Sequence, residues 1–420
     1  MREELNVSLF GSRIGTLAIE GERRSPEDWS FVYGADAVAR GGAALSVSLP
    51  LRAEPFGGAV VRNWFCNLLP EGIVREAIVA RLRLPARDDF ALLAAIGGEC
   101  AGAVSVVRPG AVASDEDGES DLDALVQHLG VAMGDGAWAT LAAPRRLSLA
   151  GAQDKLAVVR TETGLLRLPA RGELSTHILK PDSLRFPGLR DLEALGLRLA
   201  RAIGLKAIDA ELIEVGGRRA LLVERYDRSR DGKAIARLHQ EDFCQALGYP
   251  PEMKYQSQGG PGLARCAGLL RKLQLGPPAL QGFLDWVVYG VAIGNADAHA
   301  KNLALTCTPE GRRSMAPFYD LVPTIALPES LVERTPALSI GNARKIDAVE
   351  IEDWRSFAKQ ADFGARFTLD RVASLATTIR AKLPAVADRL VAEGADPRTL
   401  LERAVPAIDA QVRHLPGSTT

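Results

Sequence analysis

Two carboxylates and an amide in the last third of the sequence have the types and the spacing that phosphoryl transfer requires. Asp297 and Asn302 stand five positions apart in the run NADAHAKN (295–302), and Asp320 follows Asn302 by 18 positions. In a phosphoryl-transfer site, a carboxylate holds the hydroxyl that receives the phosphate. An amide oxygen and a second carboxylate can hold Mg²⁺, which prefers hard oxygen ligands. The spacing therefore indicates an ATP-dependent kinase.

The elements expected around this run favour the catalytic interpretation over a plain polar loop. The D-x-x-x-x-N spacing also arises by chance, and runs of small polar residues are common in loops. However, residues 280–294 are mostly apolar and end in Gly294, which is typical of a buried helix that leads into the polar run. Residues 303–307 and 316–318 are predicted short strands on either side of a turn at 309–311.

A lysine at the end of a predicted strand could supply positive charge to ATP. Lys180 ends the strand predicted at 175–180, and Glu193 lies in the amphipathic helix predicted at 189–203. Kinases pair a phosphate-contacting lysine on a strand with a glutamate of the next helix. Taken alone, Lys180 would be an ordinary surface lysine whose stem packs on apolar neighbours. The polar run at 295–302 favours the ATP-contacting role, with Glu193 as the partner in an ion pair.

The segment SLAGAQDK (148–155) is a candidate phosphate-binding loop. It matches neither G-x-x-x-x-G-K-[ST] nor G-x-G-x-x-G. Its small residues at 150–152 would let backbone amides approach phosphates, and Lys155 could add charge. A tight β-turn without a ligand is the competing interpretation.

Further candidate residues depend on the kinase interpretation. Glu224 and Tyr226 would offer backbone groups to adenine where a β lobe meets a helical lobe. Lys301 could neutralise charge during transfer, whereas His299 is expected to be structural because no His or Cys stands near it. Asp297 could instead cap a turn, as many loop aspartates do.

The composition limits the class of protein. A chain of 420 residues exceeds one typical domain, and 47% apolar with 25% charged residues is ordinary for a globular protein with a large core. A net charge of −1 shows no electrostatic footprint for nucleic acid. The five scattered cysteines predict buried reduced thiols. Because no secretory signal and no apolar run of about 18 residues occurs, a cytoplasmic protein is expected.

The first part of the chain is predicted to be a β-rich module over residues 1–108. Within it, a hairpin is expected at 5–20 with its turn at Gly11-Ser12, and a further strand at 46–51. Helical periodicity occurs at 71–83 and 89–96. The acidic stretch 109–121 is predicted to be a linker.

The remainder completes an α+β fold of the two-lobed, protein-kinase-like type. Residues 122–226 are expected to form an α/β lobe, with a helix at 121–129, a strand-like alternation at 148–159 and a hairpin at 211–224 that turns at Gly216-Gly217. Residues 227–415 are predicted to be a helical lobe that carries the polar run at 295–302, and 416–420 a flexible tail.

Taken together, these segments resemble the HipA family, the serine/threonine kinase toxins of bacterial toxin–antitoxin pairs. The most specific matches are SLAGAQDK at 148–155 and NADAHAKN at 295–302 with its downstream Tyr-Asp. Other ordered matches extend over nearly the whole chain: LSVSLPL at 45–51, NLLPEGIVRE at 67–76, IGGECAGAVSV at 96–106, THILKP at 176–181, ERYDR at 224–228, RLHQEDFCQALG at 237–248 and YDLVPT at 319–324.

The resemblance implies a role for each candidate residue. Asp297 would be the catalytic base, and Asn302 and Asp320 would bind Mg²⁺. ATP would be contacted by residues from several segments: Lys180, Ala150, Gly151, Ala152, Gln153, Lys155, Glu224, Tyr226 and Lys301. Ser148 matches a family serine whose autophosphorylation ejects the loop and silences the kinase. A phosphoserine carries about −1.5 to −2 charge and would be repelled by the phosphates of ATP.

The resemblance also implies the partners. A small helix-turn-helix antitoxin, similar to HipB, would make most of the DNA contact, and the substrate would be a translation component such as an aminoacyl-tRNA synthetase. Two other functions stay open: a small-molecule kinase, and a non-catalytic nucleotide-binding corepressor. The N-terminal module and the 148–155 loop weigh against the first. The second is disfavoured by four intact residues: Lys180, Asp297, Asn302 and Asp320. The sequence identifies neither the target protein nor the oligomeric state.

Overall fold

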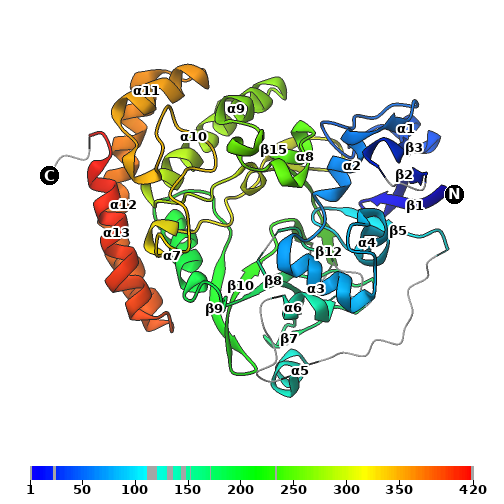
Figure 1. Cartoon of the computed structure of the whole chain (residues 1–420), viewed down its shortest axis with the longest axis horizontal. Coiled ribbons are helices and arrows are strands. Elements are labelled where there is room, and N and C mark those ends of the chain that lie inside the picture. Colours follow the sequence, from blue (N-terminus) through cyan, green and yellow to red (C-terminus); the bar gives the residue numbers. More distant parts are fainter. Residues whose placement is uncertain are drawn as a thin grey trace. The chain divides into compact units, whose positions relative to one another are not determined.

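The computed structural model describes residues 2–21, 25–110, 121–129, 136–142, 148–151, 153–170, 172–231 and 234–417. The predicted linker 109–121 lies outside the described residues except at its ends, and so do Ala152 and residues 418–420 of the predicted tail. The chain divides into two compact units. The first comprises Met1–Leu184, Ile213–Pro251 and Ala304–Arg313, and the second Arg185–Leu212, Glu252–Leu303 and Ser314–Thr420 (Figure 1).

The first unit starts with an antiparallel sheet of order β4-β3-β2-β1-β5. Its strands are β1 (Arg2–Leu9), β2 (Ser12–Glu20), β3 (Trp29–Tyr33), β4 (Phe56–Gly57) and β5 (Val104–Val107). The predicted hairpin is confirmed, but its turn lies at Phe10-Gly11, where both residues have positive φ. Alternate residues such as Leu5 and Leu17 are fully buried, as expected for a sheet with one face on a core.

Helices pack against this sheet. They are α1 (Ala35–Arg40), α2 (Ala59–Cys66), α3 (Gly72–Leu82) and α4 (Asp89–Ile96). The helices predicted at 71–83 and 89–96 are thus confirmed. Large aromatic side chains of α2 and α4, including Trp64, Phe65 and Phe90, are fully buried in the same core as the strands.

The strand predicted at 46–51 is wrong, because these described residues form a loop. Apolar residues alternate here because Leu45 and Leu49 are buried in the core, although the chain forms no strand. Hydrogen bonds to one side chain, that of Glu241, hold this loop in place of a strand ladder. Ser46 Oγ and the Val47 N–H (3.0 Å) both donate to the carboxylate of Glu241.

A second sheet has the order β7-β6-β8-β10-β9, and all of it except the start of β9 belongs to the first unit. Its strands are β6 (Leu156–Arg160), β7 (Leu166–Arg167), β8 (His177–Pro181), β9 (Ala210–Val215) and β10 (Arg218–Glu224). The hairpin of β9 and β10 turns at Gly216-Gly217, both with positive φ, as predicted. Of the alternation predicted at 148–159, only the part from Leu156 is a strand. Helix α5 (Leu122–Leu129) is confirmed, and α6 (Ala137–Ala142) follows it.

The rest of the β structure consists of short strands. These are β11 (Arg228–Asp231) with β12 (Ala234–Arg237), and β13 (His239–Asp242), β14 (Ala304–Cys307) and β15 (Arg313–Met315), with α8 (Phe243–Leu247) after β13. The strand predicted at 303–307 is confirmed, but that predicted at 316–318 is replaced by β15. Pro317 accounts for the shift, since it has no N–H to donate to a ladder.

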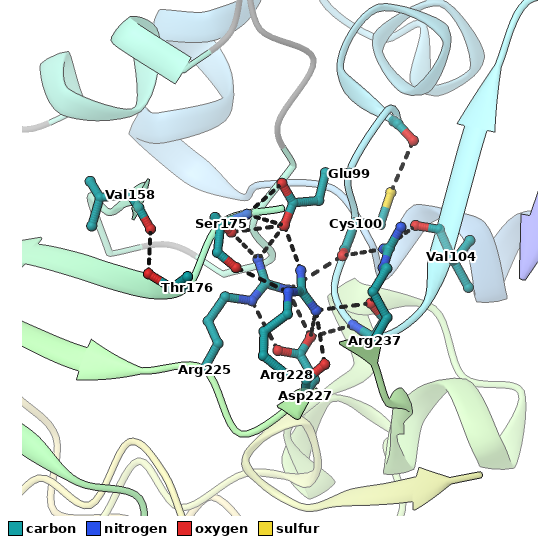
Figure 2. Close-up of polar contacts among 12 residues, drawn as sticks. Glu99, Cys100, Val104, Val158, Ser175, Thr176, Arg225, Asp227, Arg228 and Arg237 are labelled. Carbon is teal, nitrogen blue, oxygen red and sulfur yellow. Dashed lines mark hydrogen bonds and ion pairs between the residues drawn. The ribbon is translucent and has the colours of Figure 1, made fainter. Parts of the chain in front are cut away.

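A buried cluster of charges joins the residues after α4 to the chain after β10 (Figure 2). The guanidinium of Arg225 donates to both carboxylate oxygens of Asp227 (2.9 and 2.7 Å) and contacts Glu99 (3.3 Å). Arg228 contacts Glu99 and Asp227, while Ser175 Oγ donates to Glu99 (2.8 Å). Burial alone would raise the pKa of both carboxyls, but the two guanidinium groups outweigh it. They lower the pKa of Glu99, and that of Asp227 to about 2.

The second unit is predominantly helical. Its helices are α7 (Leu189–Ala202), α9 (Leu263–Lys272), α10 (Gly276–Ala292), α11 (Ile351–Gln360), α12 (Ala365–Ala392) and α13 (Val405–His414). Helix α12, coloured orange to red in Figure 1, packs against α13, which is red. Antiparallel sheets followed by this helical part confirm the predicted α+β class. Within the part of the chain that the structure describes, no helix combines the length and apolar character needed to cross a membrane.

Replacing Glu241 by Gln is expected to remove a pH-dependent loss of stability. Burial raises the pKa of Glu241 from 4.5 to about 7, so the folded state keeps a proton that the unfolded chain releases between these values. The free energy of unfolding therefore falls as pH rises through this window, by on the order of 3 kcal/mol. Urea denaturation near pH 5 and pH 8 should show Glu241→Gln gaining on the wild type at the higher pH. If the two proteins differed equally in their free energy of unfolding at both pH values, this account would be contradicted.

Candidate active site

The polar run at 295–302 is held in the second unit by the end of α10. Gly294, with φ +64°, ends this helix, and a Cβ there would lie 2.5 Å from Cβ of Ile325, so only glycine fits. Its carbonyl accepts bonds from the Ile325 N–H and from Thr324 Oγ1, both at 3.0 Å. Thr324 Oγ1 in turn accepts the Ala296 N–H (2.8 Å). Hydrogen bonds therefore hold the backbone on both sides of Asn295, at Gly294 and at Ala296.

The structure brings the two predicted metal ligands into direct contact. Asn302 Nδ2 donates to Asp320 Oδ2 (3.3 Å), while Asn302 Oδ1 accepts the His299 N–H (3.0 Å). Asp297 lies at the start of the same run with its side chain exposed, and its N–H donates to Asn295 Oδ1 (3.1 Å). The carboxylate of Asp297 thus faces solvent, while the amide of Asn302 and the carboxylate of Asp320 contact one another.

This pair offers the donor types that Mg²⁺ requires. A carboxylate and an amide oxygen are suitable ligands for a cation that keeps several waters and takes phosphate oxygens as well. In this structure the nitrogen of the Asn302 amide faces Asp320. As ligands of Mg²⁺, Asn302 would supply its amide oxygen and Asp320 a carboxylate oxygen.

Asp320 is held in an unusual backbone conformation. Its φ of +51° lies in the left-handed region, which costs a non-glycine residue roughly 1–2 kcal/mol and occurs often at functional sites. Next to it, the Leu321 carbonyl lies against Gly196 of α7, where a Cβ would come within 1.8 Å of the oxygen. Tyr289 donates its hydroxyl hydrogen to the Gly196 carbonyl (2.6 Å). A close helix contact thus sets the position of Asp320.

Lys301 and His299 are both buried beside these groups. The Lys301 carbonyl accepts the hydroxyl of Tyr319 (2.7 Å). His299 packs its ring edge-on against Tyr255, with 5.4 Å between the ring centroids. A charge-neutralising role for Lys301 stays a prediction.

The candidate phosphate-binding loop belongs to the first unit and is docked on N-terminal residues. Ser148 is fully buried, with its N–H donating to the Glu99 carbonyl (2.9 Å) and its hydroxyl to the Leu68 carbonyl (2.7 Å). Further along, the Gly151 carbonyl accepts the Glu71 N–H (3.0 Å). The loop is therefore held near both ends of its described part.

Side chains of the same loop stabilise its shape. Lys155 Nζ donates to the Ala150 carbonyl (2.8 Å), which closes the loop on itself. The carboxylate of Asp154 accepts the backbone N–H groups of Gly136, Trp138 and Ala139 at the start of α6. Gln153 is half-buried, and Ala152 lies outside the described residues. Phosphate binding by this loop stays a prediction.

The remaining candidates are divided between the units. Lys180 is buried on β8, where it pairs with Leu221 of β10, and Glu193 is buried on α7 of the second unit. The ion pair between them stays a prediction. Glu224 is the exposed last residue of β10, and the hydroxyl of Tyr226 bonds to Gln240. Their contact with adenine likewise stays a prediction.

Sequence reasoning missed Gly196 and Tyr255. Gly196 lies within a predicted helix, where a glycine can signal close packing, but nothing in the sequence indicates its partner. The hydroxyl of Tyr255 donates to Asp297 Oδ1 (2.7 Å) across 42 positions of sequence. A tyrosine in a polar loop carries no signal for such a contact.

Substituting Gly196 with Ala is expected to destabilise the fold by about 1–3 kcal/mol, the usual cost of overpacking. The added Cβ would meet the Leu321 carbonyl at 1.8 Å, so the chain next to Asp320 must move. Gly268 on α9 is the matched control, because a Cβ there has nothing within 4 Å. Gly268→Ala should stabilise by roughly 0.5–1 kcal/mol. Urea unfolding of both variants tests the contrast, and equal stabilities would refute the close contact.

Comparison with known proteins gives two family models that match the chain. One is described as a HipA-like C-terminal domain and matches residues 147–387, and the other as a HipA N-terminal domain and matches residues 5–107. Together they include both candidate loops and the first sheet.

Individual relatives agree with these models. A Sinorhizobium fredii protein, provisionally named kinase Y4mE, is 40% identical over 347 residues, which cover 79% of this chain and 80% of the relative. The serine/threonine-protein kinase toxin HipA of Shewanella oneidensis is 30% identical over 302 residues, 67% of each chain.

A solved structure has the same fold. It is a chain from the Shewanella oneidensis MR-1 complex of HipA, HipB and operator DNA, with a TM-score of 0.80 and 24% identity, covering 97% of this chain and 96% of the other. The predicted fold class is thereby confirmed.

Proposed function

The chain belongs to the HipA family, and on this premise we propose that it is an ATP-dependent serine/threonine-protein kinase that acts as the toxin of a toxin–antitoxin pair. The observation that carries the proposal is the arrangement of the run at 295–302. An exposed Asp297 precedes the contact between Asn302 and Asp320, and Asp320 is held in a left-handed conformation. Protein kinases arrange a base, an amide and a metal-binding carboxylate in this order along the chain.

The chemistry assigned to these residues is transfer of the γ-phosphoryl group to a serine or threonine hydroxyl. Asp297 would orient this hydroxyl and accept its proton as the oxygen attacks phosphorus and the bond to ADP breaks. Asn302 and Asp320 would hold Mg²⁺, which neutralises charge on the phosphates of ATP. The bonds that fix Gly294 and Ala296 support this assignment, because transfer depends on groups held in position.

Residues that would hold ATP are assigned from several segments. Lys180, with Glu193 as its partner, and Lys155 would contact phosphates, and Lys301 would neutralise charge during transfer. The backbone at 150–153 would approach the phosphates. Glu224, at the end of β10, and Tyr226, just after it, would contact adenine. What supports these assignments is the match to the family's C-terminal domain over residues 147–387.

The proposed partner is a small helix-turn-helix antitoxin of the HipB kind, with DNA bound mainly through that partner. Support comes from the fold of this chain, which is shared with the HipA subunit of a complex with HipB and operator DNA. A net charge of −1 also leaves the phosphate backbone to be neutralised by another chain. The proposed substrate is a translation component such as an aminoacyl-tRNA synthetase, and the proposed location is the cytoplasm.

Ser148 is the proposed site of inhibitory autophosphorylation. Its hydroxyl is buried and bonded to the Leu68 carbonyl, so the loop has to leave its docked position before the hydroxyl can react. A phosphoserine would add about −1.5 to −2 charge, which cannot return to a buried place against a carbonyl oxygen. Phosphorylation would therefore hold the loop away.

Incubation with Mg²⁺-ATP is expected to add one phosphate to the wild type, at Ser148. Asp297→Asn should slow this transfer by about 10²–10⁴-fold, the usual contribution of a positioned general base. Intact mass spectrometry measures the transfer, and Ser148→Ala is the control that identifies the acceptor. Unchanged transfer in Asp297→Asn would remove Asp297 from the mechanism. Phosphate on the protein also separates this proposal from a small-molecule kinase.

Asp320→Ala is expected to weaken binding of Mg²⁺-ATP, because it removes the carboxylate assigned to the cation. The loss should be roughly tenfold or more, given that hydrogen-bonded charged groups contribute about 1.5–3 kcal/mol. Titration calorimetry of Mg²⁺-ATP compares this variant with Asp297→Asn, which should bind nearly as the wild type does. Equal affinity in Asp320→Ala would contradict its role as a metal ligand.

A further inference from the structure

We infer that Tyr255 is a positioning residue for Asp297, which holds one carboxylate oxygen so that the other is available to the substrate hydroxyl. The inference rests on the proposed kinase function. Its starting point is the bond from the Tyr255 hydroxyl to Asp297 Oδ1, at 2.7 Å. Both residues belong to the second unit, and Asp297 is otherwise exposed. An exposed carboxylate rotates freely unless a neighbour holds it, and the phenol is such a neighbour.

The backbone around Tyr255 is tied to the run that contains Asp297. The Gln256 N–H donates to the Ala337 carbonyl (2.9 Å), and the Ala337 N–H donates to the Ala296 carbonyl (2.8 Å). Residues next to Tyr255 and next to Asp297 thus bond to the same residue. In addition, the Gln256 side-chain oxygen accepts the Ser339 N–H (2.9 Å). Ala337, which bonds to both Gln256 and Ala296, therefore sets the distance between their backbones.

The turn that presents Tyr255 is closed by backbone hydrogen bonds. The Tyr255 carbonyl accepts the N–H groups of both Gln258 and Gly260, at 3.1 Å each. A Cβ at Gly260 would lie 2.1 Å from the Met253 carbonyl oxygen, so the turn closes tightly on itself. The ring of Tyr255 packs edge-on against His299, at an interplanar angle of 81°. The hydroxyl is therefore presented to Asp297 by a rigid backbone and a packed ring.

The consequence for catalysis is orientation of the base. The Tyr255 hydroxyl donates to Asp297 Oδ1 and so limits rotation of the carboxylate. Because the bond occupies Oδ1, the lone pairs of the second oxygen stay available for the substrate. A hydrogen bond to a charged group contributes about 1.5–3 kcal/mol, so its loss should slow transfer roughly tenfold to a hundredfold.

The test is Tyr255→Phe, which removes the hydroxyl and keeps the ring against His299. Transfer from Mg²⁺-ATP to the protein itself, followed by intact mass, should slow roughly tenfold to a hundredfold. The ATP concentration at half-maximal rate should stay within about twofold, because the hydroxyl faces the base and not the nucleotide. Tyr249→Phe is the matched control, since it deletes a tyrosine hydroxyl outside the site and should leave the rate unchanged.

A double substitution separates orientation of Asp297 from a general structural effect. In an Asp297→Asn background, Tyr255→Phe should slow transfer no further, since the base that it orients is already lost. An equal slowing in both backgrounds, or an unchanged rate in Tyr255→Phe alone, would overturn the inference while the kinase proposal stands. Absence of any transfer by the wild type would overturn both.

Discussion

The buried ion cluster of Glu99, Arg225 and Asp227 is the constraint on which the first unit depends. Burying charges costs several kcal/mol per ion, and only complete pairing offsets this cost. Such a cluster therefore selects one geometry more than it adds stability, because a shift of one member leaves the others buried and unpaired. Glu99 also supplies the carbonyl that holds the Ser148 backbone. The position of the candidate phosphate-binding loop is thus coupled to the ion pair between Glu99 and Arg225.

The second unit meets the same demand in a different way around the candidate run at 295–302. Here close backbone contacts determine position: the carbonyl of Leu321 against Gly196, and Ile325 against Gly294. Both contacts exclude a side chain, so neighbouring segments approach within backbone distance. Asp320 is kept in a left-handed conformation between such contacts. The strain is local, and the packed helices α7 and α10 support it.

Sequence reasoning succeeded where the signal is local. Hairpins that turn at glycines and amphipathic helices both follow from spacings within a short stretch of chain. It failed where distant residues decide. The strand expected at 46–51 is a loop because Ser46 bonds to Glu241, 195 positions away, and Tyr255 meets Asp297 across 42 positions. Arg225 reaches Glu99 across 126 positions, and no local pattern indicates this partner.

The enclosed hydroxyl of Ser148 has a kinetic consequence. Ser148, the proposed acceptor, is fully buried and bonded to Leu68, so it can react only while its loop is open. Its rate of modification then cannot exceed the rate of opening, however much nucleotide is present. On the proposed assignment of Ser148 as the acceptor, opening of this short segment sets the upper limit on how fast a molecule can silence itself, and the chemical step sets the rate below that limit.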